Sequence, residues 1–416
     1  MKLTKIGQVA LTAAASLVLG LGITSCSPSN TIDYLFVTSN SPSGQIASYH
    51  VDDISGALDQ VVGSPVSSGG NDPVALVASP NQQFLYVANR DSNNIALFTI
   101  GTDGQVALTG NPTITPGSRP SSIAINSTGT LLFVVDSYGP GFSETNPGPG
   151  ALIVYPIASS GALGSPVVSR SLPYVPVQCF PSGVAVTPND SFVYVTNTNA
   201  YLTTTSNPAT IPPTGPTCPS QGTISGFSVA SNGVLSPLAG SPYLAGSTPT
   251  GIAIDPTSRF LYATDSSQNQ LIAYNILTSG GLYPLNNGPF ATGTFPVGVV
   301  VDPRDQFIYV TNYNGGTVSE YNVNQAFGAP SANADGSTTS QAAGPTCIAV
   351  DPALGRYVYA SDYLGADIGA MELDPNSGTL GSIQAAPYPS VGKPTCLVMV
   401  PHGNHMQETV SATAGQ

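Results

Sequence analysis

The side chains best suited to binding a ligand in this sequence each stand directly before a recurring proline. They are Lys393, Asp72, Arg119, Phe180 and Phe295. Two cations beside one carboxylate could bind a small anionic or hydroxylated ligand, with aromatic rings next to it. The same three charges could instead form a salt-bridged rim, Arg119–Asp72–Lys393, that binds nothing. Exposed ion pairs contribute only about 0–1 kcal/mol, so the fold should not depend on them in either case.

A second set of polar side chains ends a recurring apolar hexapeptide. Its members are Ser39, Asn89, Asp136, Asn197, Asp265, Asn312 and Asp362. Carboxylate and amide oxygens are ligands that Ca²⁺ prefers, so these side chains could hold that ion if they converged. Asn and Asp at strand ends more often hydrogen-bond to nearby backbone, and this is the role we expect. Asp136 is the carboxylate best placed to act as a catalyst or to touch a ligand.

Groups that titrate near neutral pH are scarce. The histidines are His50, in an expected outer strand, and His402 and His405, beyond the last repeat. General acid–base catalysis most often uses His, so hydrolysis has little support from these residues, although Asp136 could substitute. The sequence also has no nucleophile elbow, phosphate loop or Cys/His metal spacing.

All these positions belong to two phrases that occur seven times. The first is Phe84–Asn89 (Phe-Leu-Tyr-Val-Ala-Asn), with copies at Leu131–Asp136, Phe192–Asn197, Phe260–Asp265, Phe307–Asn312, Tyr357–Asp362 and, less regular, Tyr34–Ser39. The second is Pro249–Pro256, with counterparts beginning at Pro73, Pro120, Pro181, Pro296, Pro345 and Pro394. Repeats at intervals of 47 to 68 residues are typical of propeller blades.

Each repeat contains three apolar, β-branched runs and a weaker fourth, such as Val106–Leu108. The sequence therefore predicts an all-β protein, a seven-bladed β-propeller with four antiparallel strands per blade. By analogy with WD-repeat blades, the proline phrase should be the innermost strand. Because the repeats open on a second strand and end on an inner one, the C-terminal strand should complete the first blade. Arg259, Arg304 and Arg356 are expected to be turn residues that pair with nearby Asp.

The loops that reach the mouth of the channel vary most. Tyr138–Pro149 and Tyr201–Gln221 are long insertions on the side of the inner-strand prolines. Long loops on a rigid scaffold commonly build binding surfaces, so this face is the expected site.

The consensus Tyr-Val-Thr-Asn stands intact at Tyr194–Asn197 and Tyr309–Asn312. Over about residues 34 to 401 the chain resembles YVTN-repeat propellers and the lactonase-type family that includes 6-phosphogluconolactonase-like and carboxymuconate-cyclase-like proteins. That resemblance implies lactone chemistry and a His-containing motif on an inner strand followed by an Asp-x-Gly turn. The nearest match to the turn is Asp136-Ser137-Tyr138-Gly139, but the strand before it reads Arg119-Pro120-Ser121-Ser122-Ile123, without His.

The N-terminus has the pattern of an export signal. Lys2 and Lys5 precede an apolar stretch, and Ile23-Thr24-Ser25-Cys26 resembles a bacterial lipobox. We expect residues 1–25 to be a lipoprotein signal peptide, Cys26 to carry the lipid, and residues 26–33 to form a short tether. The propeller should span residues 34–401, and residues 402–416 should be a polar tail.

Four further cysteines are an even number, as disulfides in an exported protein require. Cys179 and Cys218 are expected to pair. Cys347 and Cys396 occupy one slot in neighbouring blades, where other blades have Gly. We expect them to be small buried residues beside the axis, with a second disulfide as the alternative.

The charge balance limits the possible partners. Asp and Glu outnumber Lys and Arg by 22 to 9, and the net charge of −13 becomes −15 once Lys2 and Lys5 leave with the signal. Such a chain repels nucleic acid and anionic lipid.

The sequence predicts a lipid-anchored extracytoplasmic propeller, a monomer, that acts as a ligand- or protein-binding module at the cell envelope. The alternative is a lactonase-like hydrolase that uses the long-loop face. The expected partner is a small molecule or an envelope protein, with membrane contact through the lipid alone. No cofactor is expected beyond the possible Ca²⁺.

Overall fold

A computed structural model describes residues 31–40, 43–199, 218, 221–339 and 343–403. This part of the chain contains 32 strands and no helix. Accordingly, the described residues include no helix that could cross a membrane. The expected signal peptide, the lipidated Cys26, most of the 201–221 insertion and His405 lie outside the described residues.

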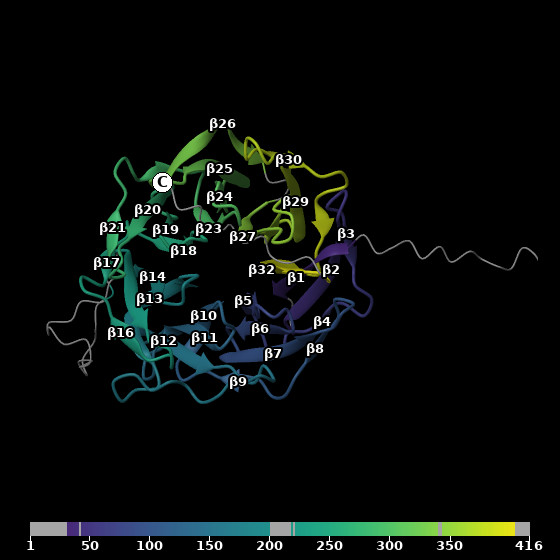
Figure 1. The fold of residues 1–416 in the computed structure, drawn as a ribbon. Coiled ribbons are helices and arrows are strands. Elements are labelled where there is room, and N and C mark those ends of the chain that lie inside the picture. Colours follow the sequence, from purple (N-terminus) through teal and green to yellow (C-terminus); the bar gives the residue numbers. More distant parts are fainter. Residues whose placement is uncertain (1–30, 41–42, 200–217, 219–220, 340–342, 404–416) are drawn as a thin grey trace, which may run out of the picture. The chain divides into compact units, whose positions relative to one another are not determined.

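The strands form seven antiparallel blades around an axis (Figure 1). The inner strands of blades one to seven are β32 (Lys393–Pro401), β5 (Pro73–Ala78), β10 (Ser118–Ile125), β13 (Val175–Val186), β18 (Pro249–Ile254), β23 (Pro296–Val301) and β27 (Pro345–Val350). The second strands are β1 (Thr31–Asn40), β6 (Phe84–Asn89), β11 (Leu131–Tyr138), β14 (Phe192–Asn199), β19 (Phe260–Asp265), β24 (Phe307–Asn312) and β28 (Tyr357–Asp362).

The third strands are β2 (Gln45–Asp52), β7 (Asn94–Ile100), β12 (Pro149–Pro156), β15 (Thr223–Val229), β20 (Gln270–Ile276), β25 (Thr317–Asn324) and β29 (Asp367–Leu373). Most outer strands consist of two short pieces: β3 (Leu58–Gln60) and β4 (Val66–Ser67), β8 (Val106–Leu108) and β9 (Thr113–Ile114), β16 (Leu235–Pro237) and β17 (Tyr243–Leu244), β21 (Leu282–Pro284) and β22 (Phe290–Ala291), β30 (Leu380–Ser382) and β31 (Tyr388–Pro389). Blade six has one outer strand, β26 (Ala329–Thr339).

The ring closes as the sequence predicts. Each inner strand contacts the inner strands of both neighbouring blades, in the order β5, β10, β13, β18, β23, β27, β32 and back to β5. The C-terminal β32 pairs antiparallel with β1, from Asp33 opposite Pro401 to Asn40 opposite Lys393. Blade one is therefore built from both ends of the described chain, and the strand edges are protected by the closed array.

Blade three differs from the regular plan because it has no separate outer strand. The first half of β13 pairs with β12 and serves as that strand, with Leu152 opposite Val175. The second half of β13 pairs with β14 as the inner strand of blade four. Blades three and four are consequently one eight-stranded sheet.

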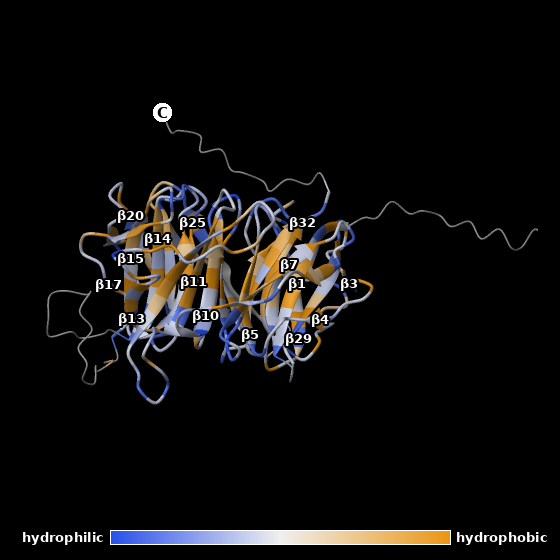
Figure 2. Cartoon of the chain, turned by 90° about the horizontal axis from the view of Figure 1, so that it is seen from below, coloured by the Kyte–Doolittle hydropathy of each residue, from blue (hydrophilic) through white to orange (hydrophobic). Residues whose placement is uncertain are grey.

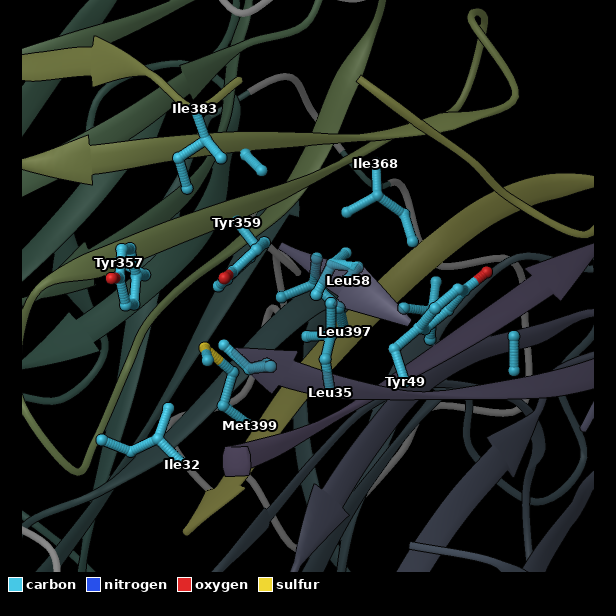
Figure 3. Close-up of a cluster of buried hydrophobic side chains, with 14 of the residues drawn as sticks. Ile32, Leu35, Tyr49, Leu58, Tyr357, Tyr359, Ile368, Ile383, Leu397 and Met399 are labelled. Atoms are coloured by element: carbon cyan, nitrogen blue, oxygen red, sulfur yellow. The ribbon is translucent and has the colours of Figure 1, made fainter. Parts of the chain in front are cut away.

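Apolar residues fill the space between blades, and hydrophobic residues are frequent along the strands (Figure 2). The described core divides into seven clusters, one for each interface between neighbouring blades. Alternate residues of a second strand point to opposite interfaces, as strand geometry requires: Leu85 contributes to the cluster with blade one, and Tyr86 to the cluster with blade three. Figure 3 shows the closing interface, where Leu35, Leu397 and Met399 of blade one face Tyr357 and Tyr359 of blade seven.

The repeated hexapeptide has a direct structural role between blades. In five blades its tyrosine hydroxyl donates to the carbonyl oxygen of a turn glycine in the next blade: Tyr86 to Gly161 (2.7 Å), Tyr194 to Gly280 (2.7 Å), Tyr262 to Gly328 (2.8 Å), Tyr309 to Gly378 (2.9 Å) and Tyr359 to Gly56 (2.7 Å). These glycines have positive φ and press against an aromatic ring, as Gly328 does against Phe260. A side chain at Gly328 would be strained and would also clash, which explains the recurring glycine.

Two disulfides join neighbouring segments. Cys179 is bonded to Cys218 with a Cα–Cα distance of 5.9 Å, as predicted. Cys347 of β27 is also bonded to Cys396 of β32, with a Cα–Cα distance of 4.8 Å. The expectation that these two residues are only small buried side chains is therefore wrong. Inner strands converge at the axis, and this brings equivalent positions of adjacent blades within bonding reach.

Candidate functional site at the mouth of the axial channel

A cavity of about 550 Å³ occupies the end of the axis at which the inner strands begin. All seven inner strands contribute the first residues after their proline to its wall. Arg90, Tyr313 and Tyr363 complete the lining. A volume of this size is typical of small-molecule sites. We call this end of the channel the mouth.

Hydroxyl groups form a ring in the cavity wall. Ser121, Ser182, Thr250, Thr346 and Thr395 each follow the inner-strand proline, and each donates to a backbone carbonyl of the next inner strand at 2.5–3.1 Å. These hydrogen bonds connect the blades around the axis. The hydroxyls are therefore committed to structural contacts and are not prepared as nucleophiles.

Two residues from each blade meet at the mouth, and we call these fourteen residues the rim. One precedes the inner-strand proline and the other follows the second-strand Asn, Asp or Ser. They are joined by backbone hydrogen bonds from Arg90 to Asp72, Ser266 to Thr248, Tyr313 to Phe295 and Tyr363 to Gly344 (2.8–3.1 Å). The predicted positions Lys393, Asp72, Arg119, Phe180 and Phe295 thus gather at one end of the axis.

The charged rim residues pair differently from the sequence-based expectation. Asp72 accepts from the Arg90 guanidinium at 2.6 Å and from the Asn40 amide at 2.9 Å. Arg119 instead pairs with Asp91 at 3.5 Å and approaches Glu144 of the 138–149 insertion at 3.9 Å. The expected Arg119–Asp72–Lys393 rim is therefore wrong, because Asp72 pairs with Arg90 of its own blade, whereas Arg119 reaches an acid on the preceding blade and one on the long loop.

Aromatic rings occupy part of the remaining rim. Lys393 Nζ lies 5.1 Å from the centroid of the Tyr363 ring, a cation–π contact. Phe295 packs on Tyr313 with centroids 6.3 Å apart, and Phe180 packs edge-on against Tyr138 at 5.8 Å. Rim chemistry consequently changes around the axis, from charged at blades one to three to aromatic at blades six and seven.

The backbone at the rim is strained. Asp72, Arg119, Phe180 and Phe295 all have φ between 50° and 59°, where non-glycine residues are uncommon. The N–H groups of Arg119 and Phe295 donate to Asn93 and Asn269 of the preceding blade at 2.7 Å, which holds this conformation. Strain of this kind concentrates at binding and catalytic sites, since a fixed backbone presents its side chain in one direction.

Asp136 does not reach the mouth. Its side chain is fully buried at the end of β11 and accepts the N–H of Gly117 at 2.9 Å. Burial raises the pKa of Asp136 to about 7, and hydrogen bonds from Thr115 and Gly117 partly oppose this shift. Asp136 is not among the residues that line the cavity, so its catalytic or ligand-binding role stays a prediction that the cavity does not support.

The other strand-end residues share this structural role. Asp265 accepts the N–H groups of Ser247 and Thr248 at 2.7 and 3.0 Å, and Asn89 accepts the Ser68 hydroxyl at 2.8 Å. Asp265 and Asn89 thus hold the loop that enters their own blade, as expected, while Asn197 and Asn312 donate to the third strand of theirs. Within the described residues, no group of three or more His, Cys, Asp and Glu is arranged to hold a metal.

The two described histidines lie at the opposite end of the axis. His402 follows the last residue of β32. The ring centroid of Tyr34 lies 5.0 Å from that of His402 and 5.4 Å from that of His50. His402 therefore packs against blade one, unlike the expected loose tail. The turn arginines are at this end too: Arg259 pairs with Asp305 and Arg304 with Asp302, as expected of turn residues, whereas Arg356 pairs with Glu372.

Arg90, Tyr313 and Tyr363 were not identified as site residues from the sequence. Arg90 pairs with Asp72, its neighbour in the rim of blade two. The signal that would have found all three is their shared position, one residue after the hexapeptide, where the repeat stops being regular.

Comparison with known proteins agrees with this architecture. The family model described as lactonase, 7-bladed beta-propeller, matches residues 43–138 and 199–347, more than half of the chain. No curated protein matches the sequence. Among solved structures, a putative 6-phosphogluconolactonase from Bacteroides fragilis is similar, at 18% identity and a TM-score of 0.69, covering 90% of this chain and 99% of that one. The periplasmic gluconolactonase of Pseudomonas aeruginosa is similar too, at 18% identity and a TM-score of 0.69, covering 90% and 100%.

Likeness at such identity shows the fold alone, whereas the family model matches the sequence itself. Together with seven blades closed around an axial cavity, that match makes the chain a member of the lactonase family of seven-bladed β-propellers.

Proposed function

We propose that this protein hydrolyses lactones in the cavity at the mouth. The observation that carries the proposal is the Arg90–Asp72 pair, which sets a guanidinium at the edge of a 550 Å³ cavity in a lactonase-family propeller. Arg90 is 39% exposed and lines the cavity, while Asp72 is nearly buried behind it. A fixed cation beside a cavity suits an ester carbonyl whose oxygen becomes negative during reaction.

In the proposed reaction, a water oxygen bonds to the lactone carbonyl carbon and the ring C–O bond then breaks. The former ring oxygen takes one proton and becomes a hydroxyl, and the new carboxylic acid releases one proton to solvent. Arg90 stabilises the oxyanion of the tetrahedral intermediate. Asp72 holds the guanidinium in place, because it accepts from Arg90 on one oxygen and from Asn40 on the other. Asp72 is also the one carboxylate among the fourteen rim residues, so it is the proposed acceptor of the proton from the water.

The absence of histidine from the described cavity wall favours a second candidate, a binding module that holds a lactone or hydroxy acid without turnover. A ligand- or protein-binding module, with no ligand specified, is the primary hypothesis from the sequence. Five of the wall hydroxyls already donate to carbonyls, which leaves few of them for proton transfer.

We further propose that the protein is exported and attached to the cell envelope through Cys26. The lipobox-like Ile23–Cys26 and the two disulfides support this location, since disulfides persist in oxidising compartments.

The test uses residues 27–416, purified without reductant, and glucono-1,5-lactone as substrate. Proton release is measured with a pH indicator and corrected for spontaneous hydrolysis. Loss of one oxyanion donor typically lowers turnover by about 10²–10³-fold, which is the effect expected for Arg90→Ala. Arg356→Ala, which removes an exposed ion pair at the other end of the axis, is the matched control and should keep the wild-type rate. Calorimetric binding of gluconate without turnover would favour the binding module, whereas absence of both would overturn this site.

A further inference from the structure

The rim residues of blades six and seven form an apolar surface that a sugar lactone would not require. Tyr313 and Tyr363 occupy the same position in adjacent blades, and both line the cavity. The equivalent residues elsewhere are polar: Asn40, Arg90, Ser137, Thr198 and Ser266. Two aromatic rings therefore stand, on one side of the cavity only, where the other blades have Asn, Arg, Ser or Thr.

Two neighbouring side chains extend this surface into solvent. Phe295 is 38% exposed although it packs on Tyr313, and Leu364, which directly follows Tyr363, is 54% exposed. Leu364 lies against Gly344 at the start of β27, where an added Cβ would come within 2.7 Å of Leu364 Cγ. Phe295, Tyr313, Tyr363 and Leu364 thus form one group, which we call the aromatic sector.

The charged side of the rim offers little to a phosphorylated substrate. Arg90 is already paired with Asp72, and Arg119 is shared between Asp91 and Glu144. Lys393 forms no ion pair with a described residue, but its ammonium group lies over Tyr363. The six charged groups Arg90, Arg119, Lys393, Asp72, Asp91 and Glu144 balance to zero, so the rim does not attract a dianion.

On the basis of the lactone hydrolysis proposed above, we infer that the substrate is an uncharged lactone with a flat apolar substituent. Its carbonyl faces Arg90, and its substituent lies on the aromatic sector across the cavity. The flat faces of Tyr313 and Phe295 suit an aryl or short alkyl group, because burial of apolar surface stabilises the complex by about 25 cal/mol for each Å² removed from water. After hydrolysis, the carboxylate of the product also faces Arg90, because it forms from the lactone carbonyl carbon.

The experiment compares kcat/KM for dihydrocoumarin, glucono-1,5-lactone and 6-phosphoglucono-1,5-lactone, each corrected for spontaneous hydrolysis. Dihydrocoumarin is expected to be the best substrate. Phe295→Ser should lower the ratio of kcat/KM for dihydrocoumarin to that for glucono-1,5-lactone about tenfold, as loss of a modest apolar contact predicts. Phe327→Ser is the matched control, since Phe327 is 69% exposed in the turn between β25 and β26, away from the cavity wall. It should leave the ratio unchanged.

A second measurement separates failure of this inference from failure of the proposed function. The lactam 3,4-dihydro-2(1H)-quinolinone has the shape of dihydrocoumarin but resists hydrolysis, and its binding is followed by calorimetry. Weaker lactam binding by Phe295→Ser than by the wild type supports the substrate class even if no lactone is turned over. A preference for the phosphorylated lactone, or an unchanged ratio in Phe295→Ser, overturns the inference while lactone hydrolysis itself stands.

Discussion

Replacing Asp136 with asparagine should make the protein more stable at pH 8 and leave it nearly unchanged at pH 4. The carboxyl is fully buried at the end of β11, and burial raises its pKa from 3.8 to about 7. A folded-state pKa above that of the unfolded chain means that folding favours the protonated form. This contribution to stability is complete below about pH 4 and is lost as the pH rises through 7.

The size of the effect follows from the pKa shift. About three pH units at 1.36 kcal/mol each correspond to roughly 4 kcal/mol, as an upper value, lost between pH 4 and pH 8. Asparagine cannot ionise, so the variant avoids this loss. Its amide oxygen can still accept the Gly117 N–H, and asparagine is the natural residue at this position in blades two, four and six.

The assay is urea unfolding of the wild type and Asp136→Asn at pH 4, 6 and 8. Asp265→Asn is the control, because both Asp265 oxygens accept backbone N–H groups, from Ser247 and Thr248. An amide keeps one oxygen, so this variant should be less stable at pH 6 and 8, the reverse of Asp136→Asn. Other buried carboxyls such as Asp33 and Asp362 titrate in both proteins, and their contributions cancel in the difference. A stability difference between wild type and Asp136→Asn that is the same at all three pH values would refute the reasoning.

Two further predictions concern the contacts between blades. Tyr262→Phe removes the hydroxyl that donates to Gly328 and leaves a buried carbonyl unpaired. The free energy of unfolding in urea should therefore fall by about 1–3 kcal/mol. An unchanged unfolding midpoint would mean that this contact is not formed in solution. Replacing Cys347 and Cys396 with serine removes a cross-link between residues that are 49 positions apart in the sequence. Measured without reductant, the unfolding free energy should fall by about 4 kcal/mol. Equal stability of the variant and the wild type would show that the two thiols are not bonded.

The fold was predictable because the repeats carry it in local patterns. Phe84–Asn89 and its copies are strands by composition, and their number and order imply closure by β32. The structural role of each repeated residue could not be predicted from the sequence, because its hydrogen-bond partner lies in the next blade. The hydroxyl of Tyr86 meets Gly161 75 residues further along the chain, and no pattern within one repeat shows that contact.

The position of the candidate site was predictable from the sequence, but the ion pairs that its charged residues form were not. Asp72, Arg119 and Lys393 do stand at the mouth, because equivalent positions of a closed ring gather at one end. Their partners Arg90 and Glu144 come from the ends of the second strands and from a long insertion, where side-chain direction depends on loop conformation. The Cys347–Cys396 disulfide was not the preferred prediction for a related reason. The two Cα atoms are close because the inner strands converge at the axis, and the spacing of the cysteines in the sequence does not show this convergence.

The regular positions of the repeat therefore stabilise the ring of blades, and the variable positions determine the side chains at the mouth. The residue after each inner-strand proline is a hydroxyl in five blades, and those hydroxyls hold neighbouring blades together. The residue after the strand-end Asn, Asp or Ser varies from Arg90 to Ser266 and Tyr313, and this position contributes Arg90, Tyr313 and Tyr363 to the mouth. A ring in which every blade was identical would present a symmetric mouth with no preferred orientation for a ligand. The change from charged to aromatic around the rim breaks that symmetry, and an asymmetric lactone can then bind with its carbonyl toward the guanidinium of Arg90.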